Sequence, residues 1–260
     1  MRYIIIIMLL LMPAGEAYAK VVKKDVFYRP GNDVLEGYLA YDDAVKGPMP
    51  GVLVFHEWWG INDYIKRRVE EVAALGYIAF APDMYGRGIR PKDAKSASGL
   101  AEILRGDRAV MRERARDGLD ELRSNPLTDR ARVAAMGYCL GGTVALELAR
   151  SGADILGAVS FHGNLDAVNP EDAKNIKGRV LVLHGSEDRL ASMEQVIAFE
   201  DEMRKNGVDW QVNIYGGAVH SFTNPASGND PSKGVAYNEK AGKRSWEAMK
   251  IFLSEIFGKR

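Results

Sequence analysis

Polar and apolar residues alternate along two segments near the start of the chain, Val21–Tyr28 and Val34–Tyr41. Alternation of this kind is typical of strands that bury one face. The turn-forming sequence Pro30-Gly31-Asn32-Asp33 lies between the two segments. The pattern therefore predicts an antiparallel hairpin.

After the hairpin, short continuous apolar runs alternate with segments of helical spacing. Continuous runs are typical of strands buried on both faces. The expected strands are Gly51–His56, Tyr77–Ala81, Arg132–Gly137, Ile155–Phe161, Arg179–His184 and Trp210–Tyr215, and the expected helices are Ile65–Leu75, Ser98–Arg123, Leu140–Arg150, Met193–Asn206 and Val235–Ile256. This order predicts an α/β fold with a mostly parallel central sheet and helices on both faces.

Residues 1–19 have the three parts of a secretory signal. Arg2 precedes an apolar run from Tyr3 to Met12, and Ala17-Tyr18-Ala19 provides small residues for cleavage. A membrane-spanning helix needs roughly 20 apolar residues, so the alternative is an uncleaved interfacial anchor. We expect cleavage after Ala19 and a periplasmic or secreted protein without stable membrane association. Residues 20–260 then form one domain.

Composition narrows the class of protein. Hydrophobic residues make up 47% of the chain and charged residues 27%, which are ordinary values for a globular domain and argue against disorder. The 35 basic and 35 acidic side chains cancel, whereas a nucleic-acid-binding protein needs a basic surface. One cysteine and four scattered histidines give no intrachain disulfide and no cysteine-based zinc spacing, so we expect no metal.

The sequence Gly137-Tyr138-Cys139-Leu140-Gly141-Gly142 lies between an expected strand and an expected helix. It matches the G-x-S-x-G nucleophile elbow with cysteine in place of serine. The sharp turn would expose the Cys139 sulfur at a helix N-terminus, where the helix dipole favours a thiolate. The alternative is a buried structural cysteine beside close-packed glycines.

An acid and a base follow in the chain order that this elbow requires. Asp188 comes after the strand Arg179–His184, and His220 comes after the strand Trp210–Tyr215. His220 would take the thiol proton and Asp188 would orient the imidazole. Glu187 competes for the role of the acid, Asp188 could instead cap a helix, and His220 could be a surface histidine. His162 and His184 are interpreted as structural or pocket-lining residues.

Glu57 follows the strand that feeds the oxyanion loop in folds of this type. The oxyanion hole would use the backbone N–H groups of Trp58 and Leu140. A carboxylate beside Cys139 would hold the thiol protonated or accept its proton. The alternative for Glu57 is a helix cap or an ion pair with Arg67 or Arg68.

Five segments of the chain carry a family resemblance: His56-Glu57-Trp58-Trp59-Gly60-Ile61-Asn62, Ala81-Pro82-Asp83-Met84-Tyr85, Gly137-Tyr138-Cys139-Leu140-Gly141-Gly142, Gly185-Ser186-Glu187-Asp188 and His220-Ser221-Phe222. The chain resembles the dienelactone hydrolase family of α/β-hydrolases from about Val26 to Phe257. The resemblance implies a Cys139–His220–Asp188 triad with Glu57 controlling the thiol. It also implies hydrolysis of esters or lactones through an acyl-thioester, with no cofactor.

The chain departs from this family at one substrate-binding position. An arginine just after H-S-F helps to hold the substrate carboxylate in the family's dienelactone hydrolases, and this chain has Asn224 there. Arg87 could replace it or be a surface arginine. An export signal is a second departure. The expected pocket residues are Trp59, Tyr85, Arg87, Tyr138, Phe222 and Asn224.

We expect a monomeric hydrolase of a small-molecule ester or lactone. A non-catalytic binding module on a hydrolase scaffold is the alternative from another class. A third interpretation is a redox-sensing thiol, although the chain lacks a second cysteine to resolve a sulfenic acid. The helix Ser98–Arg123 is interpreted as a solvated face with local ion pairs. The loop Asn224–Lys233 is either a flap beside the site or a surface loop.

Overall fold

A mixed sheet of eight strands forms the centre of the computed structural model, which describes residues 20–31 and 33–258. The strands are β1 (Val21–Tyr28), β2 (Leu35–Asp42), β3 (Met49–Phe55), β4 (Ile78–Ala81), β5 (Thr128–Tyr138), β6 (Gly157–Phe161), β7 (Arg179–Gly185) and β8 (Trp210–Tyr215). Their order in the sheet is β1-β2-β4-β3-β5-β6-β7-β8. The β1–β2 and β2–β4 pairs are antiparallel and the remaining pairs are parallel. The predicted fold class and the N-terminal hairpin are confirmed.

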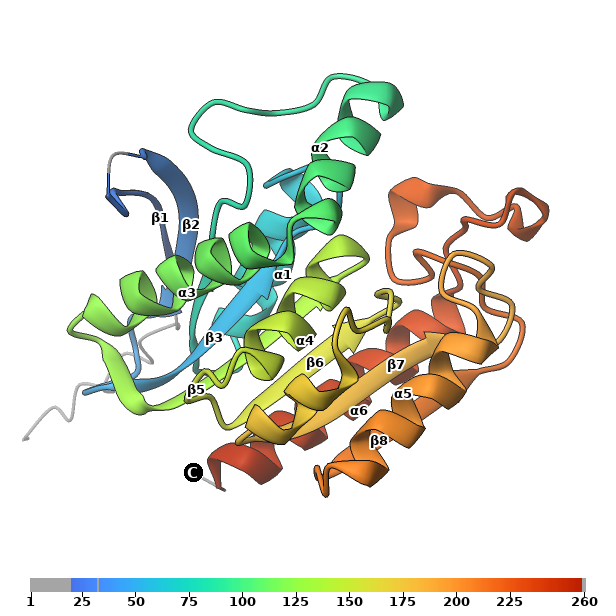
Figure 1. The fold of residues 1–260 in the computed structure, drawn as a ribbon. Coiled ribbons are helices and arrows are strands. Elements are labelled where there is room, and N and C mark those ends of the chain that lie inside the picture. The colour runs from blue at the N-terminus through green and yellow to red at the C-terminus, as the bar shows by residue number, and fades with distance from the viewer. Residues whose placement is uncertain (1–19, 32, 259–260) are drawn as a thin grey trace, which may run out of the picture.

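Helices cover both faces of the sheet (Figure 1). One face carries α1 (Asp63–Ala73) and α6 (Glu239–Phe257), and the other carries α3 (Arg108–Ser124), α4 (Leu140–Arg150) and α5 (Met193–Lys205). The helix α2 (Ala94–Gly106) extends past the C-terminal ends of the strands. Three short 3-10 helices, η1 (Pro170–Asn175), η2 (Pro225–Ser227) and η3 (Pro231–Lys233), lie in connecting segments.

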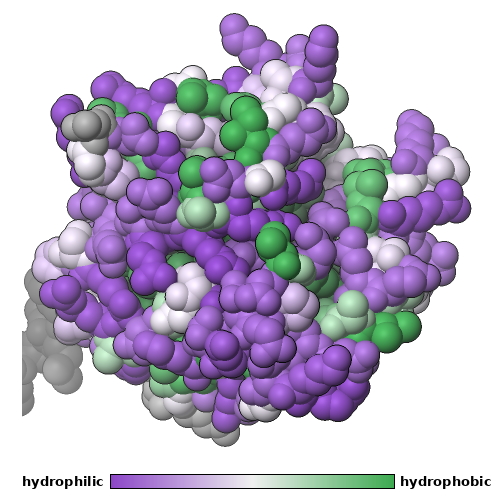
Figure 2. Space-filling view, in the orientation of Figure 1, coloured by the Kyte–Doolittle hydropathy of each residue, from purple (hydrophilic) through white to green (hydrophobic). Residues whose placement is uncertain are grey.

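The face of the molecule in Figure 2 is largely hydrophilic, and apolar residues form separate small patches on it. Within residues 20–31 and 33–258, no helix has the length and apolar content needed to cross a bilayer. The predicted leader, residues 1–19, lies outside the described residues.

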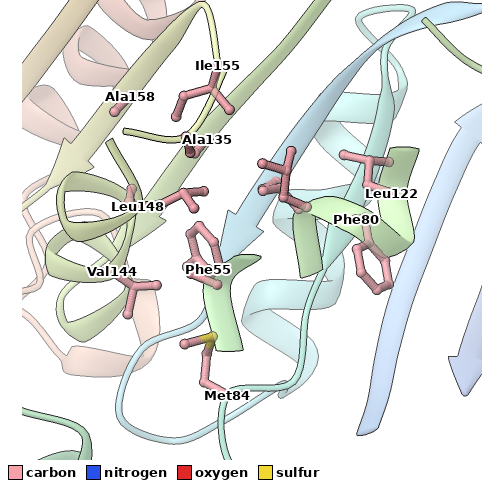
Figure 3. Close-up of a cluster of buried hydrophobic side chains, with 14 of the residues drawn as sticks. Phe55, Phe80, Met84, Leu122, Ala135, Val144, Leu148, Ile155 and Ala158 are labelled. Carbon is pink, nitrogen blue, oxygen red and sulfur yellow. The ribbon is translucent and has the colours of Figure 1, made fainter. Parts of the chain in front are cut away.

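The continuous apolar runs of the sequence form the buried strands of the sheet. All seven residues of β3 are buried, and β3 lies between β4 and β5. Phe55, Phe80, Leu122 and Leu148 pack in one cluster between the sheet and the helices α3 and α4 (Figure 3). Full burial of each such side chain contributes about 1.5–3 kcal/mol. Helices on both faces thus explain why these strands show runs instead of alternation.

The helix expected over Ser98–Arg123 is two helices, so its predicted continuity is wrong. Gly106 ends α2, and Asp107 has a non-helical backbone with φ −123° and ψ 87°. The Asp107 carboxylate accepts a hydrogen bond from Val110 N at 3.0 Å, as a helix N-cap does. A glycine followed by a capping aspartate therefore ends one helix and starts the next.

The last helix begins at Glu239 and not at the expected Val235. Asn238 caps α6 by accepting a hydrogen bond from Ala241 N at 3.1 Å. Val235 instead forms a parallel bridge with His220. This segment therefore supports the loop after β8.

The turn from β5 into α4 has no room for side chains at its glycines. A Cβ on Gly141 would lie 2.2 Å from the Phe55 carbonyl oxygen, and a Cβ on Gly137 would lie 2.1 Å from the Gly141 oxygen. Between them Cys139 has φ 53°, a conformation that costs a residue with a Cβ about 1–2 kcal/mol. The first turn of α4 therefore packs main chain against main chain on the end of β3.

Gly141→Ala should destabilise the protein by more than about 3 kcal/mol, because backbone atoms of β3 and α4 must separate to admit the methyl group. Gly99→Ala is the matched control, since nothing lies within 4 Å of a Cβ at that position of α2. The control should gain about 0.5–1 kcal/mol. Urea unfolding of both variants measures the two changes. A wild-type midpoint for Gly141→Ala would contradict this account of the turn.

Candidate active site

Cys139 lies at the C-terminal ends of the strands, between β5 and α4. It is 8% exposed and borders a pocket of about 970 Å³. Because α4 begins at Leu140, the sulfur stands at a helix N-terminus, where the backbone dipole favours negative charge. The thiol is therefore accessible to a ligand in the pocket.

Segments far apart in the sequence enclose this pocket. The helix α2 contributes to one side and the loop after β8 to the other (Figure 1). The lining residues are Glu57, Trp58, Trp59, Asn62, Asp63, Tyr64, Ser98, Arg105, Cys139, Asn164, Leu190, His220, Ser221, Asn224, Ala226, Ser227 and Val235. Large apolar side chains with a few polar groups are typical of small-molecule sites. The loop Asn224–Lys233 thus borders the site, as one of its two interpretations required.

The structure brings the side chains of His220 and Asp188 together. His220 Nδ1 and Asp188 Oδ2 are 2.9 Å apart. A carboxylate can only accept, so Nδ1–H donates, and Nε2 is the nitrogen left to exchange a proton with the thiol. Nε2 forms no hydrogen bond of good geometry among the described residues, but the Cys139 side chain lies near enough to raise the pKa of His220. The competing residue Glu187 is exposed and contacts Ser186 instead.

Charges around His220 favour its protonated form. Burial lowers the pKa of His220, but charge on the Cys139 sulfur and the Asp188 carboxylate outweigh burial and raise that pKa to about 10. Burial also raises the pKa of Asp188, yet the hydrogen bond from His220 brings it below its ordinary value. The imidazole can therefore take a proton from the thiol and keep it as an imidazolium beside two negative groups.

Glu57 is buried and held by the loop after β8. Its Oε2 accepts a hydrogen bond from Asn224 Nδ2 at 2.8 Å, and its Oε1 accepts one from Ser221 Oγ at 3.2 Å. The ion pairs of Arg67 and Arg68 are with Glu71. Burial raises the pKa of Glu57, although the two hydrogen bonds oppose this effect. Glu57 is therefore neither the cap nor the arginine ion pair that was its alternative.

The His56 side chain fixes a peptide group of the oxyanion loop. His56 Nδ1 lies 2.6 Å from the Glu57 carbonyl oxygen, and its Nε2 accepts from Met84 N at 3.3 Å. His56 therefore donates to the Glu57 carbonyl. In a trans peptide the next N–H points the opposite way, which sets the direction of the Trp58 N–H. The N–H groups of Trp58 and Leu140 have no acceptor among the described residues.

The expected pocket residues divide into two groups. Trp59 and Asn224 line the pocket, and the Trp58 and Trp59 rings lie 5.0 Å apart. Four others lie outside the lining. Tyr138 and Phe222 are buried, the Tyr85 hydroxyl donates to Trp58 O at 2.9 Å, and the exposed Arg87 lies over the Phe27 ring at 4.9 Å. The periodicity and motifs do not reveal which way such side chains point.

Sequence reasoning missed three groups of this site. Arg105 was assigned to a solvated helix face, yet it lines the pocket. Ser221 lies in the H-S-F segment that carries the resemblance. The motif does not predict its hydrogen bond to Glu57. His56 stands in the segment His56–Asn62 that carries the resemblance, but its hydrogen bonds to Glu57 and Met84 are not predictable from the motif. Among residues 20–31 and 33–258, no cluster of three or more His, Cys, Asp or Glu side chains could hold a metal ion.

The model of the dienelactone hydrolase family matches residues 35–257. The chain belongs to this family. The solved structure m3DLH is 43% identical, with a TM-score of 0.88, and the match covers 92% of this chain and 99% of that one. A dienelactone hydrolase-like promiscuous phosphotriesterase from metagenomic libraries is 42% identical, with a TM-score of 0.86 and the same coverage. A protein of Aquifex aeolicus (strain VF5), provisionally named a carboxymethylenebutenolidase, is 28% identical over 82% of this chain and 90% of its own length. This dienelactone hydrolase family member has the α/β-hydrolase fold.

Glu57→Gln should stabilise the protein more at about pH 8 than at about pH 5. The buried carboxyl group, whose pKa is raised in the fold, binds its proton more tightly in the folded chain than in the unfolded chain. Wild-type stability therefore falls as the pH rises through that pKa, and glutamine removes the charge. The melting temperature should rise by about 2–4 °C for each kcal/mol gained.

Glu187→Gln is the control for this experiment, because Glu187 is an exposed carboxylate in the neighbouring loop. It should leave the melting temperature unchanged at both pH values. If Glu57→Gln changes the melting temperature equally at both, the buried carboxyl does not titrate as stated.

Proposed function

We propose that this family member hydrolyses carboxylic esters or lactones through a thioester acyl-enzyme, with no cofactor. The observation that carries the proposal is the Asp188–His220 hydrogen bond of 2.9 Å beside a pocket-lining thiol. An orienting carboxylate, an imidazole with a free Nε2 and a thiol are the parts of nucleophilic acyl transfer. A complete set of these groups favours an enzyme over a binding module.

In this mechanism the Cys139 sulfur attacks the substrate carbonyl carbon, and the developing oxyanion accepts hydrogen bonds from Trp58 N–H and Leu140 N–H. The His220 imidazolium then gives its proton to the leaving alkoxide. Neutral His220 next removes a proton from water, which attacks the thioester and frees the acid and the thiol. Asp188 stabilises the imidazolium in both half-reactions. Glu57 controls whether the thiol holds its proton before substrate enters.

The site of action proposed for the enzyme is the periplasm or the cell exterior. The basic residue, apolar run and A-x-A sequence of residues 1–19 support removal of a leader after Ala19. We propose a monomer that neither binds nucleic acid nor stays on a membrane, in keeping with the balanced charge of the chain.

Mass spectrometry of the purified protein tests the mechanism. The intact chain should begin at Lys20 and gain one acyl group on Cys139 when mixed with p-nitrophenyl esters or small lactones. His220→Ala should block release of that acyl group, and Cys139→Ala should abolish turnover while the circular dichroism spectrum stays unchanged. Paraoxon belongs in the panel because this chain is similar to a promiscuous phosphotriesterase.

Other outcomes separate the alternatives. Tight binding of an ester without adduct or turnover, with the thiol shown to be reduced, would favour the binding module. Rapid oxidation of Cys139 by mild peroxide with no ester hydrolysis would favour the redox sensor. Full activity in Cys139→Ala would exclude the thiol mechanism.

We also propose that the substrate carries an anionic group that Arg105 binds. Arg105 lines the pocket, and its buried Nε has no hydrogen-bond partner among the described residues. Asn224, at the position where the family's dienelactone hydrolases have an arginine, is engaged with Glu57. A pocket-lining guanidinium without an acid partner is suited to a substrate carboxylate.

Arg105→Met should raise KM for p-nitrophenyl hemisuccinate by about tenfold or more, which corresponds to one charge-assisted hydrogen bond. It should leave KM for neutral p-nitrophenyl butyrate unchanged. Arg87→Met is the control, because Arg87 is exposed outside the pocket. An equal rise in KM for both esters would show that Arg105 does not bind the charged group of the substrate.

A further inference from the structure

His162 connects the two halves of the site, although the mechanism above does not use it. It follows β6 and is 1% exposed. The backbone N–H of Cys139 is shared between Phe161 O at 3.0 Å and His162 Nδ1 at 3.1 Å. On the other side of the ring, His162 Nε2 lies 2.7 Å from Thr223 Oγ1. One imidazole therefore links the elbow to the loop of the catalytic histidine.

These contacts define the protonation of His162. A backbone N–H can only donate, so Nδ1 accepts from Cys139 and the proton is on Nε2, which donates to Thr223. Burial lowers the pKa of His162 well below its ordinary value, and the nearby positive charge of His220 lowers it further. The ring therefore stays neutral, as both hydrogen bonds require, and it adds no positive charge beside His220.

Thr223 gives the link a rigid anchor. Its hydroxyl also lies 2.7 Å from the Tyr64 hydroxyl, and its carbonyl accepts from Arg68 Nη2 at 2.9 Å. Both partners belong to α1. Thr223 is 1% exposed and lies three residues after His220. The far end of the link is therefore held by a helix and not by a free loop.

The His162 ring also touches the catalytic imidazole. The ring centroids of His162 and His220 are 5.2 Å apart at 66°, and those of His162 and Phe222 are 5.2 Å apart at 78°. His162 itself has φ 42°, a backbone conformation that costs about 1–2 kcal/mol. A strained, buried and fully hydrogen-bonded histidine at this place fits a constraint on geometry.

We propose that His162 is a positioning residue, which sets the separation and tilt of His220 relative to Cys139 by joining the elbow to Thr223. The inference rests on the proposed thiol mechanism. A displacement near 1 Å of a catalytic group can cost about a hundredfold in rate, so loss of one such link is expected to slow the acylation step and leave substrate binding intact.

The test breaks the His162–Thr223 hydrogen bond from each of its two sides. His162→Asn keeps an acceptor for the Cys139 N–H and loses the donor to Thr223, while Thr223→Val removes the hydroxyl at nearly the same volume. Each should slow the acylation burst with p-nitrophenyl acetate by about tenfold or more, while the ester concentration that gives half of the maximal burst rate stays unchanged. The double variant should be no slower than His162→Asn alone, because both changes break the same link.

A second readout reports the Cys139–His220 geometry without turnover. Alkylation of Cys139 by iodoacetamide, followed against pH, should shift toward higher pH in both single variants, since an imidazolium placed farther away stabilises a thiolate less. Thr128→Val is the matched control. Thr128 is also a buried threonine, at the start of β5, and its hydroxyl donates to Leu122 O at 2.6 Å outside the pocket lining. It should lower the melting temperature and keep the wild-type burst and alkylation profile.

Wild-type burst rates and alkylation profiles in folded Thr223→Val would overturn the proposal, and so would losses that multiply in the double variant. If His162→Asn does not fold, Thr223→Val with the alkylation profile still decides the matter. Failure of the proposed function would look different: the wild-type protein would form no acyl adduct, although its thiol would still be alkylated.

Discussion

Contact between the main chain of α4 and the end of β3 determines where the groups of this site stand. Gly141 leaves no space for a Cβ against the Phe55 carbonyl, so the distance between the two segments is set by backbone radii alone. On one side of the contact lie Cys139 and the Leu140 N–H, and on the other side lie Glu57 and the Trp58 N–H. Repacking of side chains elsewhere cannot change that spacing, because no side chain lies in it.

The buried carboxyl of Glu57 accepts hydrogen bonds from neutral donors, and the lack of a cationic donor affects its protonation. Asn224 and Ser221 stabilise a carboxylate less than a guanidinium would, so Glu57 takes up a proton more readily than it would beside an arginine. An arginine at position 224 would fix the charge of Glu57 and also supply a cation to the substrate. In this chain the two tasks are divided, because Asn224 contacts Glu57 while Arg105 brings a cation to the pocket from α2.

Sequence patterns predict the secondary structure and the chain order of the candidate catalytic residues better than they predict side-chain contacts. The strand runs, the elbow glycines and the order of Cys139, Asp188 and His220 depend on local geometry, which a sequence records directly. The choice between Asp188 and Glu187 depends on one residue of offset in a loop, and only the folded chain decides it. Arg105 lines the pocket from α2, a helix that ends at Gly106 and is separate from α3, and hydrophobic spacing does not reveal this break. The roles of His56 and Tyr85 depend on β4 lying beside β3, a pairing of segments distant in the sequence.

The bridge between His220 and Val235 makes the position of the catalytic histidine independent of the shape of the pocket rim. The ends of the intervening loop are tied together by Ala236 N donating to His220 O at 3.1 Å and Asn238 N donating to Phe222 O at 3.0 Å. Ala226 and Ser227, inside the loop, line the pocket. Insertions or deletions between these tied ends would reshape the pocket rim and leave the catalytic histidine in register. The scaffold can thus acquire new substrate preferences by changing the length of one surface loop, without a new arrangement of its reacting groups.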